Sequence, residues 1–158
     1  MTIRNAAKAL IVHENKLLLV KYRGRAGEKC YTIPGGGQSS LETMEEAIVR
    51  ECLEETGYQV AVSDFLALYE EIIWDKAYQE RNPDYAHKIF HIFLCRLRST
   101  QPLAPTEEDM GQMGCEWVHL DRVSSLNLYP LALRENISSL LKGKCPMFLG
   151  TRKIPFAQ

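Results

Sequence analysis

The stretch at residues 36–58, GGQSSLETMEEAIVRECLEETGY, carries the most information about fold and function in this chain. It begins inside a run of glycines, continues through a segment with helical spacing and stops at a glycine. Because residues three and four apart are neighbours on a helix, Glu51, Glu54 and Glu55 are expected to project from one side. Carboxylates that close repel each other unless a cation lies among them. An all-oxygen cluster of this kind suits Mg²⁺ or Mn²⁺.

The same stretch indicates where its helix begins and ends. The pattern predicts a helix over residues 43–56, with Thr43 as N-cap and Glu46 completing a capping box. Gly57 is well placed to end it, because a left-handed residue commonly follows the last helical turn. The apolar stripe of this helix is formed by Met44, Ala47, Ile48 and Cys52.

The glycines in front of the helix suggest a second contribution to the site. Glycine permits backbone geometries closed to other residues, so the carbonyl of Gly35 or Gly36 is expected to share the cation with the helix carboxylates. Arg50 lies eight residues after Glu42, and we expect the two to pair and hold the loop against the helix. A cation fixed here would bridge phosphate oxygens and acidify a water molecule.

Size and composition fit one ordinary globular domain spanning residues 1–158. The net charge of -1 provides no global basic field for nucleic acid. No apolar run approaches membrane-spanning length, and no signal peptide is expected at the N-terminus. The cysteines are odd in number and scattered, which favours a reduced, cytoplasmic protein over a disulfide scaffold or a zinc site.

Strands are predicted on both sides of the central helix. Residues 5–13 and 17–22 form two strands joined by a turn at Glu14-Asn15, and a short β-prone run at 31–33 leads into the glycines. Further strands are expected at 58–62, 65–74, 87–97 and 116–120, with loops at 23–30, 75–86 and 99–115. Asp121 is expected to cap a short helix through Leu126, and residues 130–141 form a final amphipathic helix. This order of elements indicates a mixed sheet covered by helices.

The spacing of the central stretch is more specific than its glutamates alone, which are typical of a solvated helix face. Five residues separate Gly36 from Glu42, and seven separate Glu42 from Arg50-Glu51. An apolar residue, any residue, Glu54-Glu55, any residue, Gly57 and a large apolar residue follow. This pattern matches the Nudix box throughout, so the chain resembles the MutT/Nudix hydrolase family.

The resemblance implies an α/β/α sandwich with a mixed sheet and Mg²⁺-dependent hydrolysis of a nucleoside diphosphate linked to another group, X. It implies that Glu51, Glu54 and Glu55 bind the metal with help from the Gly35 or Gly36 carbonyl. Glu51 or Glu54 would also orient or deprotonate the attacking water. Arg50 and Glu42 become a supporting pair, although Glu42 is also placed to face the metal. Two departures from many members are Ser39, in place of glutamate, and Leu41, in place of glycine.

Residues outside the box are candidates for substrate contacts. Family members often recruit an acidic residue from a distant loop, and Glu108 with its neighbours Glu107 and Asp109 offers one, although a solvated loop explains them equally well. Arg23 is the preferred phosphate contact among the cations before the glycines, and Tyr31 introduces the box where the family often has tryptophan. The remaining candidates are Lys21, Arg25 and Lys29 for phosphate and Trp74, Tyr78 and Tyr85 for stacking on a base.

The histidines and cysteines outside the box point to no second site. His87 and His91 share one face of a predicted strand, and Cys95 continues the row. Residues four apart on a strand are separated by roughly 13 Å, too far to share one metal. We expect structural or substrate-lining roles for them, and an inert thiol at Cys30, which has no evident base nearby.

The sequence leaves the group X open. Residues 73–76 lack the proline typical of the ADP-ribose class, the coenzyme A motif is not matched at 17–25, and Tyr78 is a weak sign of the dinucleoside polyphosphate class. A nucleoside triphosphate or a nucleotide sugar is the broad expectation, and a homodimer is expected from the family alone. The alternatives are a non-catalytic nucleotide sensor of Nudix fold, an isoprenoid diphosphate isomerase and an enzyme that processes RNA 5′ ends.

Overall fold

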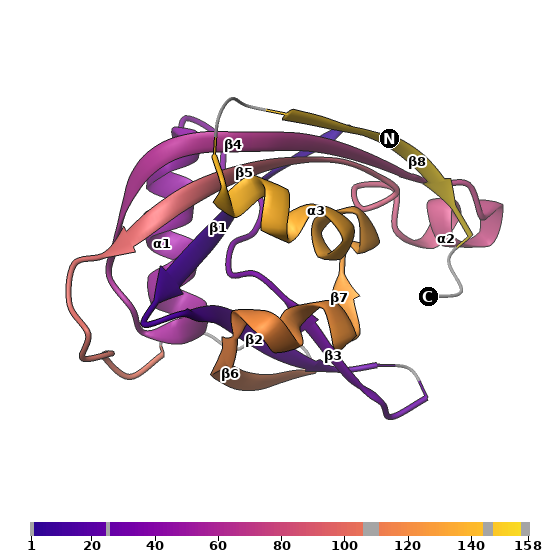
Figure 1. Ribbon diagram of the computed structural model, residues 1–158. Helices are drawn as coiled ribbons and strands as arrows, with labels where there is room; N and C mark the ends of the chain where they lie inside the picture. Colours follow the sequence, from indigo (N-terminus) through magenta and orange to yellow (C-terminus); the bar gives the residue numbers. More distant parts are fainter. Residues whose placement is uncertain (1, 25, 106–110, 144–146, 156–158) are drawn as a thin grey trace.

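The computed structural model describes residues 2–24, 26–105, 111–143 and 147–155. Their strands form one mixed sheet in the order β7-β3-β2-β1-β5-β4-β8, and β6 pairs with β2 (Figure 1). The strands are β1 (Arg4–His13), β2 (Lys16–Arg23), β3 (Lys29–Thr32), β4 (Val60–Ile73), β5 (His87–Leu97), β6 (Gln112–His119), β7 (Leu128–Tyr129) and β8 (Met147–Ile154). The helices are α1 (Met44–Thr56), α2 (Lys76–Arg81), α3 (Leu131–Leu141) and the 3₁₀ segment η1 (Leu120–Ser125).

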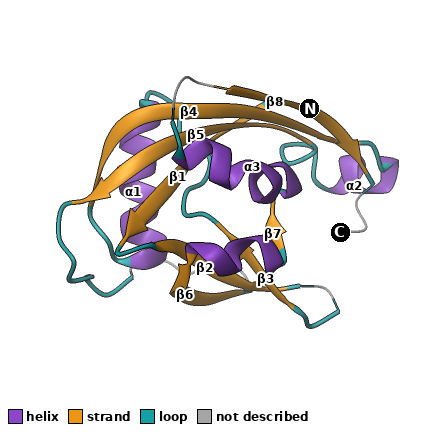
Figure 2. Cartoon of the chain, viewed as in Figure 1, coloured by secondary structure: helices purple, strands orange, loops and turns teal. Residues whose placement is uncertain are grey.

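The strand β1 lies between the two longer helices, and its alternating side chains explain this position. Ala7, Ala9 and Ile11 pack with apolar residues of α1, whereas Leu10 belongs to the apolar cluster that contains α3 residues. Successive side chains of a strand point to opposite faces. Figure 2 shows α1 and α3 on the two sides of β1. The curled, mixed sheet between helices confirms the predicted α/β/α class.

The first hairpin and the central helix form where the sequence predicts them. Glu14 and Asn15 both have positive φ, at 47° and 61°, as a tight hairpin turn requires. At the start of α1, the Thr43 side chain accepts a hydrogen bond from the Glu46 amide, and the Glu46 side chain accepts one from the Thr43 amide. Gly57 ends the helix in the left-handed conformation, with φ of 74°. The capping box and the glycine stop are therefore confirmed.

Several elements differ from the prediction. The two strands expected at 58–62 and 65–74 are one strand, β4, whose pairing with β5 is interrupted by two register shifts. The loop expected at 75–86 contains α2, because Asp75 caps a short segment of good helix formers through the Tyr78 amide. The strand expected at 116–120 begins at Gln112, within the loop predicted over 99–115. Asp121 lies inside η1 instead of capping it, since His119 occupies the N-cap position.

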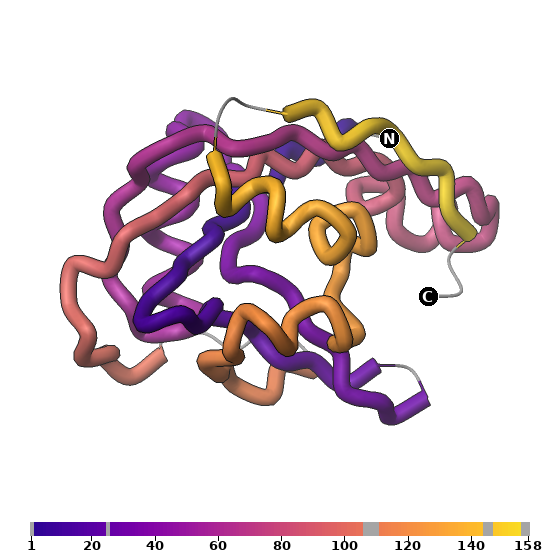
Figure 3. The backbone as a smooth tube through the Cα atoms, in the orientation of Figure 1, coloured from indigo at the N-terminus to yellow at the C-terminus, as the bar shows by residue number. Residues whose placement is uncertain are grey.

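Two strands near the end of the chain were not predicted. The strand β7 has two residues and pairs in parallel with β3. The strand β8 pairs in parallel with β4, so the chain returns from α3 to the edge of the sheet (Figure 3). Both are hard to recognise locally, because β7 is too short to show a period and β8 contains Gly150.

Candidate active site

The glycine loop is fixed against β1 by the backbone. The amide of Ala9 donates to the Pro34 carbonyl and that of Ala7 to the Gly36 carbonyl, each at 2.9 Å. Gly35 has φ of +119°, and a Cβ built there would lie 2.2 Å from the Ala7 carbonyl oxygen. Only glycine fits this approach. The loop formed by Gly35, Gly36 and Gly37, called the glycine ledge below, is therefore fixed in place on β1.

The expected pair between Arg50 and Glu42 forms. Arg50 donates from Nε to Glu42 Oε1 at 2.8 Å and from Nη2 to Glu42 Oε2 at 3.0 Å. The same guanidinium donates to the Gly37 carbonyl at 3.1 Å. These bonds hold the pKa of Glu42 down at about 2, and the carboxylate raises the pKa of Arg50. Loop and helix are thus joined by a charge-assisted fork.

Two of the three helix carboxylates, Glu51 and Glu55, contact the same loop, and Glu54 lies beside Glu51 through Arg50. Arg50 Nη1 donates to Glu51 at 2.8 Å and to Glu54 at 3.0 Å. The Glu51 carboxylate lies so close to Gly36 that a Cβ at Gly36 would come within 2.5 Å of it. Glu55 instead accepts a hydrogen bond from the Gly35 amide at 2.8 Å. Within the described residues, no three acidic, histidine or cysteine side chains are already grouped around a common point as metal ligands.

Burial shapes the chemistry of Glu55. Its relative exposure is 4%, and burial raises its pKa above the ordinary value. The nearby Lys8 ammonium and the Gly35 amide act in the opposite direction and favour the charged carboxylate. Lys8 donates hydrogen bonds to the carbonyls of Gly35 and Ile33. A lysine from β1 therefore lies beside both the glycine loop and the Glu55 carboxylate, a role that the sequence did not reveal.

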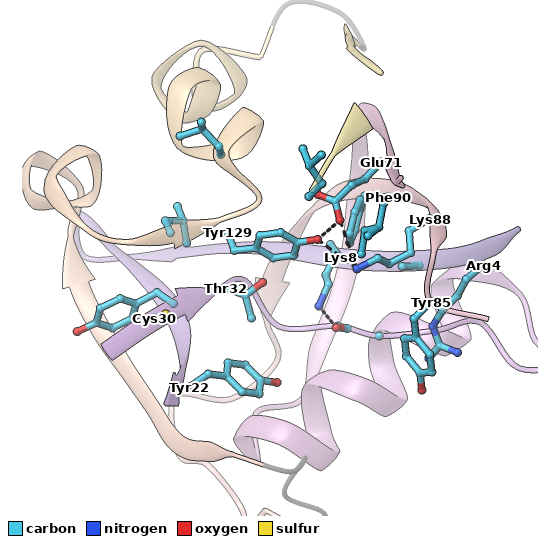
Figure 4. A pocket seen from close by; sticks show the side chains of 18 of the residues that line it. Arg4, Lys8, Tyr22, Cys30, Thr32, Glu71, Tyr85, Lys88, Phe90 and Tyr129 are labelled. Carbon is cyan, nitrogen blue, oxygen red and sulfur yellow. Dashed lines mark hydrogen bonds and ion pairs between the residues drawn. The ribbon is translucent and has the colours of Figure 1, made fainter. Parts of the chain in front are cut away.

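A cavity of about 610 Å³ opens beside this corner (Figure 4). Its walls include the glycine loop and Glu55 at one end and aromatic and charged side chains of the sheet at the other. Such a volume lies within the ordinary range for small-molecule sites. The lining residues absent from the sequence-based expectations include Arg4, Lys8, Glu71, Lys88, Phe90 and Tyr129.

The other predicted candidates fall into separate places. Tyr31 is buried and lines the cavity, and so does Cys30, whose thiol pKa is raised by burial. Arg23 is exposed at the end of β2 and is not among the lining residues. Glu107, Glu108, Asp109 and Arg25 lie outside the described residues.

The aromatic and histidine candidates also separate. Tyr78 and Tyr85 line the cavity, whereas Trp74 does not. His87 pairs with Glu70 at 2.7 Å, and the His91 ring lies 6.4 Å from that of Phe65. Neither histidine lines the cavity, which leaves the structural reading for both.

Comparison with known proteins places this geometry in a family. The model of the NUDIX domain matches residues 2–138. The chain belongs to the Nudix family. A Nudix relative, the ADP-ribose pyrophosphatase of Methanocaldococcus jannaschii, is 41% identical over 64 residues, which cover 40% of this chain and 38% of that protein. The phosphatase NudJ of Escherichia coli K12 is 26% identical over 86% of this chain and 82% of its own length.

Solved structures agree on the fold. The MutT protein from Bacillus halodurans superposes with a TM-score of 0.72 at 18% identity, covering 98% of this chain and 92% of that one. The Nudix domain and the pyrophosphatase relatives identify the chain as a Nudix hydrolase. No helix in the described ranges is both long and apolar enough to cross a membrane.

Proposed function

We propose that this Nudix hydrolase cleaves the diphosphate linkage of a nucleoside diphosphate joined to another group, with Mg²⁺ as cofactor. The main support for this proposal is that Glu51 and Glu55 both contact the glycine loop, which lines the cavity together with Glu55. Glu54 adjoins them through Arg50, which also binds Glu51. Carboxylate and carbonyl oxygens are the ligands that Mg²⁺ takes in proteins, and Mn²⁺ is an alternative.

The donor set fits such a cation in its chemistry. Glu51, Glu54 and Glu55, with the Gly35 or Gly36 carbonyl, would hold the metal. When bound, the cation would neutralise phosphate charge and lower the pKa of a water molecule. Arg50 Nη1 holds Glu51 and Glu54 side by side, at 2.8 and 3.0 Å, so that either carboxylate is placed to orient or deprotonate the attacking water.

Cations of β1 would bind the substrate phosphates. Arg4 and Lys8 line the cavity, and their even spacing places both on the same face of the strand. The Arg4 guanidinium lies beside Gly37 and 4.6 Å from the centre of the Tyr85 ring. This pair replaces Arg23, which lies away from the cavity, as the favoured phosphate contact in our proposal.

The function is tested by a Mg²⁺-dependent phosphate-release screen. The compounds are nucleoside triphosphates, ADP-ribose and other nucleotide sugars, dinucleoside polyphosphates and capped RNA. ADP-ribose is included because the archaeal relative is named for it, although this chain lacks the proline associated with that class. We expect turnover of at least one nucleotide, abolished in Glu54→Gln and retained in Glu45→Gln, which alters an exposed glutamate on the same helix. Full activity in Glu54→Gln would refute the metal-ligand assignment.

A non-catalytic sensor is the second reading of the same pocket. It requires tight binding of a nucleotide with no turnover of any compound in the screen. The complete set of box residues favours the enzyme. We also propose a cytoplasmic location, since the described cysteines, Cys30, Cys52, Cys95 and Cys115, are all free thiols. The expected homodimer stays a prediction.

A further inference from the structure

A row of charged side chains crosses the sheet along the cavity wall, from β1 through β5 to β4. Arg4 on β1 pairs in register with Lys88 on β5, and Lys88 pairs in register with Glu71 on β4. Residues directly opposite each other on neighbouring strands share one face of the sheet. All three line the cavity. The row is therefore part of the cavity wall, and its residues belong to strands outside the Nudix box.

Tyr129, on β7, completes this row. Its hydroxyl donates to Glu71 Oε1 and accepts a hydrogen bond from Lys88 Nζ at 3.1 Å. Lys88 Nζ also lies 3.3 Å from the same Glu71 oxygen. Figure 4 shows the three polar groups meeting inside the cavity. Burial raises the pKa of Tyr129 well above its ordinary value, so the hydroxyl remains a donor at neutral pH.

Each charged member has hydrogen-bonding capacity beyond this cluster. Both partners of Glu71 use Oε1, and Oε2 makes no hydrogen bond within the described part of the chain. The Lys88 ammonium has three N–H donors, of which Tyr129 and Glu71 account for two. An acceptor and a donor thus stand side by side at the wall of the cavity.

Burial of the Glu71–Lys88 ion pair carries a desolvation penalty. The side chains of Glu71 and Lys88 are 2% and 16% exposed. Replacing a buried ion pair by apolar residues is often neutral or stabilising, so stability alone gives little reason for it here. Aromatic residues adjoin the pair, with the Phe90 ring centre 5.6 Å from Lys88 Nζ. Polar groups that converge beside aromatic side chains in the wall of a cavity are typical of a ligand site.

The separation between the glycine loop and the Glu71–Lys88 pair suits the length of a nucleotide. Lys8 lies beside Gly35 and Glu55. Lys88 pairs in register with Arg4, four residues from Lys8 along β1, so the Cα atoms of Lys8 and Lys88 are roughly 13 Å apart or more. One cavity contains both ends. A ligand whose phosphates lie at the glycine ledge would therefore extend its nucleoside toward Glu71 and Lys88.

We propose that Glu71 and Lys88, oriented by Tyr129, bind the hydrogen-bonding edge of the substrate's nucleobase and select among bases. The carboxylate accepts a base N–H, the ammonium donates to the neighbouring base acceptor, and the aromatic wall contacts the ring face. This proposal rests on the proposed function only in placing the phosphates at the glycine ledge. The competing interpretation, called the latch below, is that the hydrogen bonds among Glu71, Lys88 and Tyr129 serve only to hold β7 against the sheet.

The test measures binding separately from hydrolysis. The probes are the α,β-methylene analogues of ADP, GDP, UDP and CDP, with methylenediphosphonate as the base-free probe, titrated calorimetrically with Mg²⁺. We expect the wild type to prefer one base. Glu71→Gln and Tyr129→Phe should weaken binding of that analogue by about tenfold or more, as expected for a lost hydrogen bond to a charged group. Binding of methylenediphosphonate should stay unchanged.

The matched control is Glu70→Gln, one residue away on the opposite face of β4. Glu70 bonds His87 and Thr151 and does not line the cavity, so base preference should be retained. Tyr129→Phe removes a single oxygen. If Glu71→Gln fails to fold, binding of the preferred analogue to Tyr129→Phe tests base recognition instead. An equal loss for every probe, or no loss, would overturn base recognition and support the latch.

The two proposals fail in different ways. A wild type that binds nucleotides with a base preference but turns over nothing in the screen would refute the hydrolytic function and leave base recognition standing. If the wild type, Glu71→Gln and Tyr129→Phe all hydrolyse nucleotides with the same base preference, base recognition by Glu71 and Lys88 would be refuted and the hydrolytic function would stand.

Discussion

Arg50 binds both carboxylate oxygens of Glu42, through Nε at 2.8 Å and Nη2 at 3.0 Å. Glu42 stands just before α1, whereas Arg50 lies in its second turn. The fork therefore fixes the approach of the loop to the helix. Its remaining nitrogen, Nη1, reaches Glu51 and Glu54, so one guanidinium sets both the loop and two proposed metal ligands.

Arg50→Lys should destabilise the protein and lower its turnover. A lysine retains the charge but lacks the planar fork. Loss of charge-assisted hydrogen bonds to Glu42 should lower the free energy of unfolding by about 1–3 kcal/mol, measured by urea denaturation. Arg122→Lys, at an exposed position in η1, is the control. Equal midpoints for Arg50→Lys and wild type would contradict this account.

Stability should fall in acid through Glu42. The pKa of this carboxyl in the folded protein is about 2, against an ordinary 4.5, because Arg50 binds the charged form. A depressed pKa means that the contribution is complete above pH 4.5 and is lost as pH falls toward 2. The difference in unfolding free energy between wild type and Glu42→Gln should therefore shrink over that window. A difference that is constant with pH would show that Glu42 does not titrate in this way.

Leu41→Gly should stabilise the loop. Leu41 is fully exposed, at 103% relative exposure, and has φ of 66°. The left-handed conformation strains a residue with a Cβ, so glycine should raise the unfolding free energy by about 0.5–1 kcal/mol after its own entropic cost. Leu41→Ala keeps the Cβ and serves as the comparison. Thermal melting measures the change, and equal gains in both variants would rule out strain relief.

Lys8→Met should weaken binding of the phosphate end of the ligand. It removes the ammonium bonded to the Gly35 and Ile33 carbonyls and a cation that lowers the pKa of Glu55. We expect methylenediphosphonate with Mg²⁺ to bind about tenfold more weakly by calorimetry. Lys16→Met, outside the cavity lining, should bind as wild type does. Unchanged affinity in Lys8→Met would remove Lys8 from the phosphate site.

The parts of the fold that could be predicted are governed by neighbours in sequence. The N-cap Thr43, its partner Glu46 and the stop at Gly57 lie within one helix, and the hairpin turn occupies two adjacent residues. The pair between Arg50 and Glu42 could be predicted for the same reason, because the two residues lie only eight positions apart in the sequence.

The rest of the site depends on contacts between distant segments. Lys8 lies among buried alanines of β1, and its hydrogen bond to the Gly35 carbonyl, from a segment distant in sequence, accounts for its position. Glu71, Lys88 and Tyr129 come from three strands whose register the sequence does not specify. Arg23 is close to the glycine loop in sequence, but it is not among the residues that line the cavity.

The two ends of the cavity can diverge separately in evolution. The carboxylates at one end are contained in a single helix, so selection for hydrolysis acts on one short segment. Base recognition at the other end would reside in single positions on β4, β5 and β7, each free to mutate without touching that helix. Paralogues that share the box could thus change substrate specificity by a few substitutions. Grafting Glu71, Lys88 and Tyr129 onto one of them would transfer the preference for a nucleobase and leave the hydrolytic reaction as it is.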